Sequence, residues 1–171
     1  AKVTTNTSGD LSAPSNGTQR NQYKFLEVSY NTHHWMQSAV FDIKVEQIYP
    51  LGSEVAYYKL HVGYLHTNSG GSQGGSGGSN NDWVLTRVYS SKANANYDHE
   101  IVVGTPTDTG FDSGDYDIFK VPIYLENDHY AKHRVTVSVS EKFSQVSTFT
   151  GQNQYIFTAL PTATTLTGQV N

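Results

Sequence analysis

The chain has 171 residues, and 11 Lys and Arg stand against 15 Asp and Glu, which gives a formal net charge of −4 at pH 7. Because the few basic residues are scattered, the sequence argues against a phosphate-binding surface for nucleic acid. The absence of Cys excludes a disulfide framework and a thiolate zinc site, and no run of 18 apolar residues is present that would predict membrane insertion.

The N-terminal residues 1–21 are rich in Thr, Ser, Asn and Gly, which predicts an extended arm or linker ahead of a single domain over residues 22–171. The alternatives are plain disorder and an arm that packs on a neighbour. The segment is polar and lacks both an initiator Met and the apolar stretch of a signal peptide. We therefore expect the chain to be a piece of a longer protein.

Three runs of alternating apolar and polar residues follow, at 23–30, 39–49 and 55–65, and a period of two predicts half-buried antiparallel strands. The apolar faces expected for these runs are Leu26, Val28 and Tyr30, then Phe41, Ile43 and Val45, then Tyr58, Leu60, Val62 and Tyr64. Tyr58 and Tyr64 are expected in the core or at a subunit interface. Tyr57 is expected on the opposite, exposed face.

The short polar segment between the first two runs carries His33, His34 and Trp35. One interpretation is a ligand-facing loop in which Trp35 stacks on a sugar ring and the His side chains bind hydrogen-bonding partners or a metal. The other is that Trp35 plugs the end of the sandwich. Adjacent His residues on a strand point to opposite faces, so at most one of the two could face a symmetry axis.

The second half of the chain continues in the same style. A Gly-rich tract at 68–81 predicts a flexible loop, available to a receptor or simply a tolerated insertion. Further strands are predicted at 83–89, 100–103, 116–125, 134–140 and 154–160, with a turn cluster at 108–115. Pro122 favours an edge strand or a bulge. The chain is thus expected to be all-β, an antiparallel jelly-roll sandwich of about eight to ten strands whose edges oligomerisation would cover.

The densest acidic cluster contains Asp112, Asp115 and Asp117, beside glycines that allow a tight loop. Carboxylate and carbonyl oxygens are the ligands of Ca²⁺, so calcium is one interpretation; a solvated turn is the other. Otherwise the sequence predicts no cofactor. His129 and His133 have the spacing of a helical metal pair, but their surroundings do not predict a helix.

Three stretches together resemble the C-terminal domains of bacteriophage tail fibres, tailspikes and neck appendages: FLEVSYNTHHWMQSAVFDIKV, YYKLHVGYL and YDIFKVPIYLENDHYAKHRVTVSVS. The resemblance implies a jelly roll like those of tumour necrosis factor and C1q heads, assembled as a homotrimer on the virion. It implies that the domain binds a host-surface glycan or protein and performs no covalent chemistry. The receptor-binding candidates are His34, Trp35, Tyr57 and Trp83.

Two other functions remain open. Some domains of this kind are trimerisation modules and intramolecular chaperones that cleave themselves off near their N-terminal boundary. Ser8 and Asp10 lie in a suitable arm, which this interpretation takes to be exposed, although no cleavage motif surrounds them. The second alternative is a carbohydrate-binding module attached to a bacterial enzyme.

Overall fold

The computed structural model describes part of this chain. The described residues are 5–8, 10–12, 20–31, 38–50, 54–65, 81–91, 99–105, 107–113, 116–127, 131–143, 154–157 and 169–170. Every secondary-structure element among them is a β-strand. None of these residues belongs to a helix long and apolar enough to cross a membrane.

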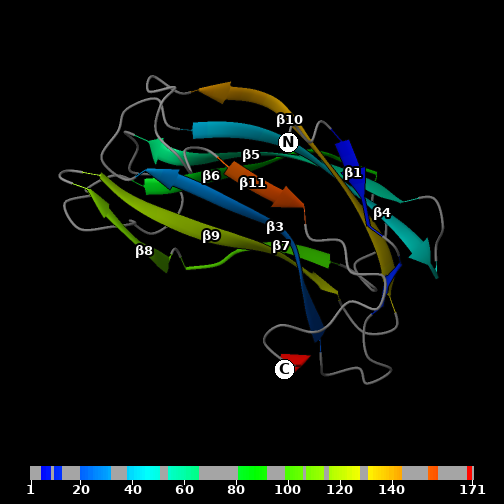
Figure 1. Ribbon diagram of the computed structural model, residues 1–171. Helices are drawn as coiled ribbons and strands as arrows, with labels where there is room; N and C mark the ends of the chain where they lie inside the picture. The colour runs from blue at the N-terminus through cyan, green and yellow to red at the C-terminus, as the bar shows by residue number, and fades with distance from the viewer. Residues whose placement is uncertain are drawn as a thin grey trace.

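The strands form two antiparallel sheets, which Figure 1 shows as two layers. The first sheet has the order β1-β10-β4-β5-β6, and β2 also pairs with β10. Its strands are Thr5–Thr7 (β1), Leu11–Ser12 (β2), Ser38–Tyr49 (β4), Val55–Leu65 (β5), Asn81–Ser90 (β6) and Lys132–Phe143 (β10). Strands β4, β5 and β6 are consecutive in the chain and lie side by side as a meander.

The second sheet has the order β11-β3-β9-β7, and β12 pairs with β3 while β8 pairs with β9. Its strands are Arg20–Asn31 (β3), His99–Val103 (β7), Thr107–Ser113 (β8), Tyr116–Asn127 (β9), Gln154–Phe157 (β11) and Gln169–Val170 (β12). The chain therefore passes from one sheet to the other between β2 and β3, β3 and β4, β6 and β7, β9 and β10, and β10 and β11. The all-β prediction is confirmed, and the two sheets form a sandwich.

The hydrophobic core lies between the sheets and takes side chains from both. The expected inward residues Phe41, Ile43 and Val45 of β4 are all 1% exposed or less, as are Leu60 and Val62 of β5. Facing them, the second sheet contributes Tyr23, Phe25, Leu26, Val28, Ile101, Val121, Ile123 and Leu125. Burial of these alternating aliphatic and aromatic side chains is the main force that holds the sheets together.

A register shift in β3 explains why two neighbouring residues are both buried. The pairing of β3 with β9 shifts between Lys24 and Leu26, and Phe25 is the extra residue. Phe25 and Leu26 are both fully buried. An extra residue in one strand reverses the faces of the residues beyond it, so Phe25 and Leu26 can both point into the core.

Two local expectations for the second sheet are wrong. Residues 108–113, predicted as part of a turn cluster, belong to strand β8, which pairs with β9. For Pro122 the sequence favours an edge strand or a bulge, and the edge alternative is wrong, because β9 lies between β3 and β7 in the sheet. The proline is tolerated because the strand opposite is interrupted there: β7 ends at Val103 and β8 begins at Thr107. No ladder hydrogen bond is then required from the missing N–H of Pro122.

The N-terminal segment is also different from the expected arm. Strands β1 and β2 pair with β10 of the same chain, and Leu11 is part of the hydrophobic core. Ser8 is 5% exposed, so the expectation of an exposed position is wrong for this residue. The described residues between 5 and 12 therefore form an edge of the first sheet, whereas residues 20 and 21 already belong to β3.

Candidate functional site

The outer face of the first sheet carries two exposed tyrosines side by side. Tyr57 on β5 and Tyr89 on β6 are register partners, 42% and 53% exposed, and their ring centroids are 6.0 Å apart at an interplanar angle of 47°. The ladder shifts between Tyr57 and Tyr58, which leaves Val88 as an extra residue of β6. This bulge lies beside the pair, and Val88 is 58% exposed.

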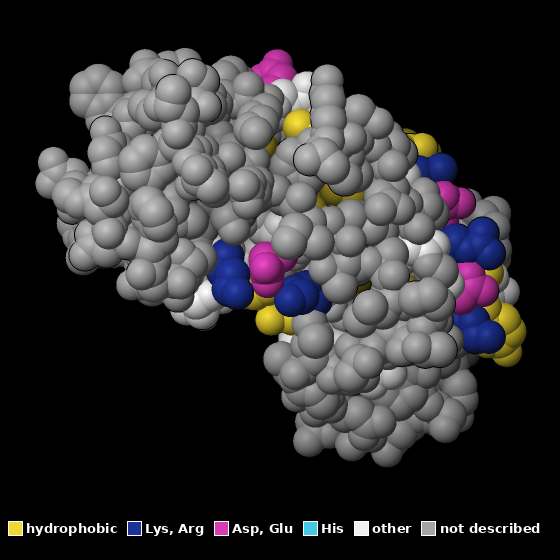
Figure 2. Space-filling view, viewed as in Figure 1, with side chains coloured by type: hydrophobic (Ala, Val, Ile, Leu, Met, Phe, Trp, Pro, Cys, Tyr) yellow, Lys and Arg dark blue, Asp and Glu magenta, His cyan; other side chains and the backbone are white. Residues whose placement is uncertain are grey.

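Charged side chains border the two rings on the β4 side. Lys44 is the register partner of Tyr57, and the neighbouring Asp42 is the partner of Lys59. Lys59 Nζ lies 2.8 Å from Asp42 Oδ1, and Lys44 Nζ lies 3.0 Å from Glu46 Oε1. We call Tyr57, Tyr89, Lys44, Glu46, Lys59 and Asp42 together the tyrosine surface. Figure 2 shows basic and acidic side chains alternating along one border of the molecule, with hydrophobic side chains beside them.

The charges of the tyrosine surface balance one another. The hydrogen bond that Lys44 donates to Glu46 raises the pKa of Lys44, and the one that Lys59 donates to Asp42 raises the pKa of Lys59, so both ammonium groups stay charged at neutral pH. Two lysines stand against two carboxylates, which gives the surface no strong net field. Such a face can stack aromatic rings on a flat apolar partner while the ionised groups bind hydroxyls around it.

A second polar feature lies inside the sandwich and links the two sheets. Tyr58 Oη of β5 lies 2.8 Å from His99 Nε2 of β7, and the His99 ring meets the His133 ring of β10 edge to face, with centroids 4.9 Å apart. His133 Nδ1 lies 2.9 Å from Asn127 Oδ1 of β9, and Asn127 Nδ2 donates to the Leu11 carbonyl at 2.7 Å. We call these groups the histidine chain.

A small pocket borders the histidine chain at this end of the sandwich. It is lined by Val45, Gln47, Glu54, Val55, Ala56, Ser90, His99 and His133. His133 is 1% exposed and Gln47 4%. Among the described residues, no three His, Cys, Asp or Glu side chains are placed to hold a metal ion. The pocket is suited to organising polar groups in the interior and offers little room for a substrate.

The sequence-predicted receptor candidates are divided among different regions. Tyr57 is exposed as expected and belongs to the tyrosine surface. Trp83 is only partly exposed and packs against the hydrophobic core, which argues against a role as a stacking platform. His33, His34 and Trp35 lie outside the described residues, as do residues 68–80 of the Gly-rich tract.

The acidic cluster keeps its open interpretation. Asp112 of β8 and Asp117 of β9 are register partners, so their backbones lie side by side, while Asp115 lies outside the described residues. Calcium binding by these three residues stays a prediction.

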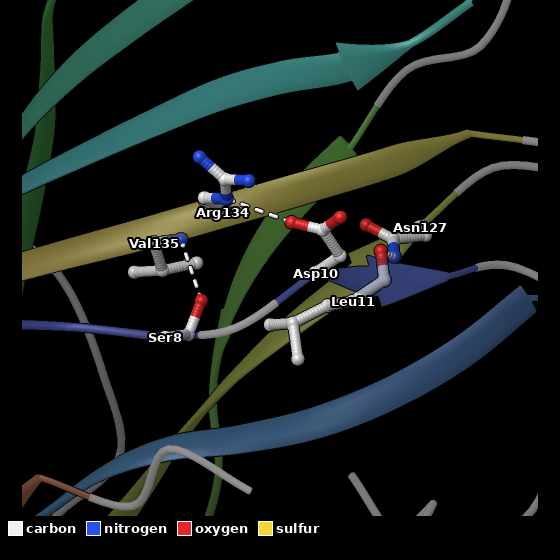
Figure 3. Close-up of polar contacts among 6 residues, drawn as sticks. All are labelled: Ser8, Asp10, Leu11, Asn127, Arg134 and Val135. Carbon is white, nitrogen blue, oxygen red and sulfur yellow. Dashed lines mark hydrogen bonds and ion pairs between the residues drawn. The ribbon is translucent and has the colours of Figure 1, made fainter. Parts of the chain in front are cut away.

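Ser8 and Asp10, the candidate cleavage residues, are both bound to β10. Ser8 N donates to the Val135 carbonyl at 2.8 Å, and Val135 N donates to Ser8 Oγ at 2.9 Å. Arg134 Nε donates to Asp10 Oδ1 at 2.7 Å, and Figure 3 shows this contact and the bond from Val135 N to Ser8 Oγ along one stretch of β10. Self-cleavage at this place stays a prediction.

Sequence reasoning missed Tyr89, His99 and the role of His133. Tyr89 lies in the run predicted as a strand at 83–89, but its position beside Tyr57 follows from the register of β5 with β6. For His99 and His133 no local sign exists, since the two residues are in different sheets.

Comparisons of this chain with protein-family models, with curated proteins and with solved structures find no match.

Proposed function

We propose that this chain is the head domain of a bacteriophage adsorption protein, a homotrimer on the virion that binds a host-surface receptor and catalyses no reaction. The proposal starts from the sequence resemblance to tail-fibre, tailspike and neck-appendage domains. Beyond the two-sheet sandwich that is observed, we propose that the domain has a jelly-roll topology and assembles as a trimer. The observation that carries receptor binding is the exposed Tyr57–Tyr89 pair on an open sheet face.

A glycan is the receptor chemistry that the tyrosine surface supports best. Two aromatic rings offer a platform for the apolar face of a sugar, and four ionised groups beside them offer donors and acceptors for hydroxyls. Because the lysines and carboxylates balance, the surface favours a neutral glycan over a strongly charged one. A protein receptor that inserts an apolar side chain between the rings is the competing occupant.

The test combines the mass of the particle with its binding to host cells. Light scattering is expected to give three chains per particle. The trimer is expected to bind intact cells or their purified surface glycan, and Tyr57→Ala and Tyr89→Ala are each expected to weaken binding about tenfold, as interface hot spots do. Tyr49→Ala is the matched control, since Tyr49 is as exposed as Tyr89 but lies at the end of β4.

The outcomes separate the alternatives. A well-folded trimer that binds no host cell would rule out receptor binding by this domain and favour the trimerisation and chaperone role. A monomer that binds glycan through the same two tyrosines would favour the carbohydrate-binding module. Equal losses for Tyr49→Ala and Tyr57→Ala would remove the tyrosine surface from the proposal.

A further inference from the structure

The two exposed tyrosines belong to a row of residues that crosses the first sheet from β6 to β10. Tyr89 is the register partner of Tyr57, Tyr57 is the partner of Lys44 on β4, and Lys44 is the partner of Thr136 on β10. Register partners on antiparallel strands lie directly opposite each other, so the row runs across the strands. We call these four residues the tyrosine row.

The tyrosine row lies on the outer face of the sheet. The residues that flank its members along β4, β5 and β10 are all buried in the core: Ile43, Val45, Ala56, Tyr58, Val135 and Val137. Because successive side chains of a strand point to opposite faces, Lys44, Tyr57 and Thr136 point outward. The Lys44 side chain is 38% exposed and Thr136 is half-buried, so a ligand can follow the row beyond the two rings.

A second row runs beside the first, two residues away along β4, β5 and β10. Its members are Thr86 of β6, Lys59, Asp42 and Ser138 of β10, which are register partners in that order. The two rows together present hydroxyls, ammonium groups and a carboxylate, which are donors and acceptors of hydrogen bonds. Such a mixture fits a partner that carries many hydroxyls.

The charges on this face occur in opposite pairs. Three ion pairs of the described residues lie on it: Lys44–Glu46, Lys59–Asp42 and Arg134–Asp10. Three basic groups thus stand against three carboxylates. A ligand with a high charge of either sign would meet as many repelling groups as attracting ones, whereas hydroxyls can donate to the carboxylates and accept from the cations. The face is therefore complementary to a neutral, hydroxyl-rich ligand.

The two rings set the direction in which such a ligand extends. Their centroids are 6.0 Å apart along the row, and their planes are inclined by 47°. One sugar ring is narrower than this separation and cannot lie flat on two inclined planes at once, so each tyrosine stacks on a sugar of its own. The line through both rings continues over Lys44 to Thr136. With neighbouring strands ~4.8 Å apart, the row is ~14 Å long, which is more than two sugars occupy.

We propose that the tyrosine surface binds a linear neutral glycan that lies across the strands, with successive sugars on Tyr89, Tyr57, Lys44 and Thr136. This inference rests on the proposed function and specifies its ligand and the direction of binding. The tyrosines supply the stacking at one end. Thr136 and Ser138 bind hydroxyls of the sugars furthest from the rings, which extends the site to β10.

The dependence of affinity on glycan length tests this arrangement. The probe is the surface glycan purified from cells that the protein binds, cut by partial acid hydrolysis and separated into fragments of one to eight sugars. Isothermal titration calorimetry with the full chain measures the dissociation constant of each fragment. We expect the affinity to rise about tenfold between two and four sugars, as added hydrogen bonds contribute, and to change little with further length.

Variants at the two ends of the row separate stacking from hydrogen bonding. Thr136→Val removes the hydroxyl and keeps the shape, and it is expected to weaken binding of the four-sugar fragment about fivefold while leaving the two-sugar fragment unchanged. Thr136→Ser, which keeps the hydroxyl, is expected to bind like the wild-type protein. Tyr57→Ala is expected to weaken both fragments. The matched control is Ser140→Ala, which removes an exposed hydroxyl of β10 outside both rows and should affect neither.

The outcomes distinguish this inference from the proposed function. Equal affinity for one sugar and for eight, or a Thr136→Val effect that is absent or equal for both fragments, would overturn the linear arrangement and leave receptor binding through the tyrosines in place. Failure of the folded protein to bind host cells would remove receptor binding itself. Cell binding that protease treatment of the cells abolishes, with no affinity for any glycan fragment, would identify a protein receptor and overturn the inference.

Discussion

At the level of single residues, Gly104 shows how closely two backbones approach at the break between β7 and β8. Its N–H donates to the Pro122 carbonyl at 2.8 Å. A Cβ atom at this position would lie 2.8 Å from Pro122 Cγ, 2.9 Å from Tyr124 Cε2 and 3.2 Å from the Pro122 carbonyl oxygen. Two of these distances are shorter than Cβ contacts normally are, and Pro122 has a rigid ring. Only a residue without a side chain fits here.

Gly104→Ala is accordingly expected to destabilise the fold by about 1–3 kcal/mol, the usual cost of forcing extra atoms into a packed site. Urea unfolding followed by tryptophan fluorescence measures the free energy of unfolding. Thr105→Ala, at the exposed neighbouring position, is the control and should change it by less than about 0.5 kcal/mol. Equal stability of Gly104→Ala and wild-type protein would contradict the close approach.

At the level of elements, the pairing of the N-terminal segment with β10 depends on one side chain. The register runs from Thr7 opposite Thr136 to Leu11 opposite His133, so the segment has one residue more than β10. Where the ladder is interrupted, Ser8 Oγ accepts the hydrogen bond of Val135 N in place of a backbone carbonyl. The side chain thereby keeps a buried N–H satisfied across the bulge.

Two substitutions in this segment should therefore differ in cost. Ser8→Ala leaves the buried Val135 N–H without its acceptor, which is expected to cost about 1–3 kcal/mol. Asp10→Ala removes an ion pair whose side chains are 44% and 45% exposed, and the expected cost is about 0–1 kcal/mol. Thermal or urea unfolding compares the two. A larger loss for Asp10→Ala than for Ser8→Ala would show that the exposed ion pair, and not the serine, holds the segment.

At the level of the whole molecule, acid is expected to weaken the sandwich through His61. Burial lowers the pKa of His61, and Glu141 opposes this shift only in part. The unfolded chain, whose His pKa is ordinary at about 6.5, then binds the proton more readily than the folded one. Stability is full above the ordinary value and falls as the pH drops below it.

His61→Gln is expected to make the free energy of unfolding fall less steeply between about pH 7.5 and about pH 5 than in the wild-type protein. Urea unfolding at several pH values gives this slope. An unchanged slope would mean that His61 titrates alike in the folded and unfolded chain.

The sandwich and most of its strands could be read from the sequence, because the alternation of Phe41, Ile43 and Val45 in one strand and of Val135 and Val137 in another is a local consequence of burying one face. The same rule placed Tyr57 outside correctly. The rule failed for residues 108–113, which contain few apolar residues and show no alternation. These residues form a strand because their backbone pairs with β9.

The amino-acid pattern thus suffices for the all-β class, the core-facing residues of the main strands and the exposure of Tyr57. Only the folded arrangement brings distant residues together: Tyr89 beside Tyr57, His99 against His133, and Ser8 on Val135. The difference lies in the separation along the chain over which each effect acts. Alternation acts between neighbours along the chain, whereas these contacts depend on strand order, register and bulges, which the packing of both sheets settles together.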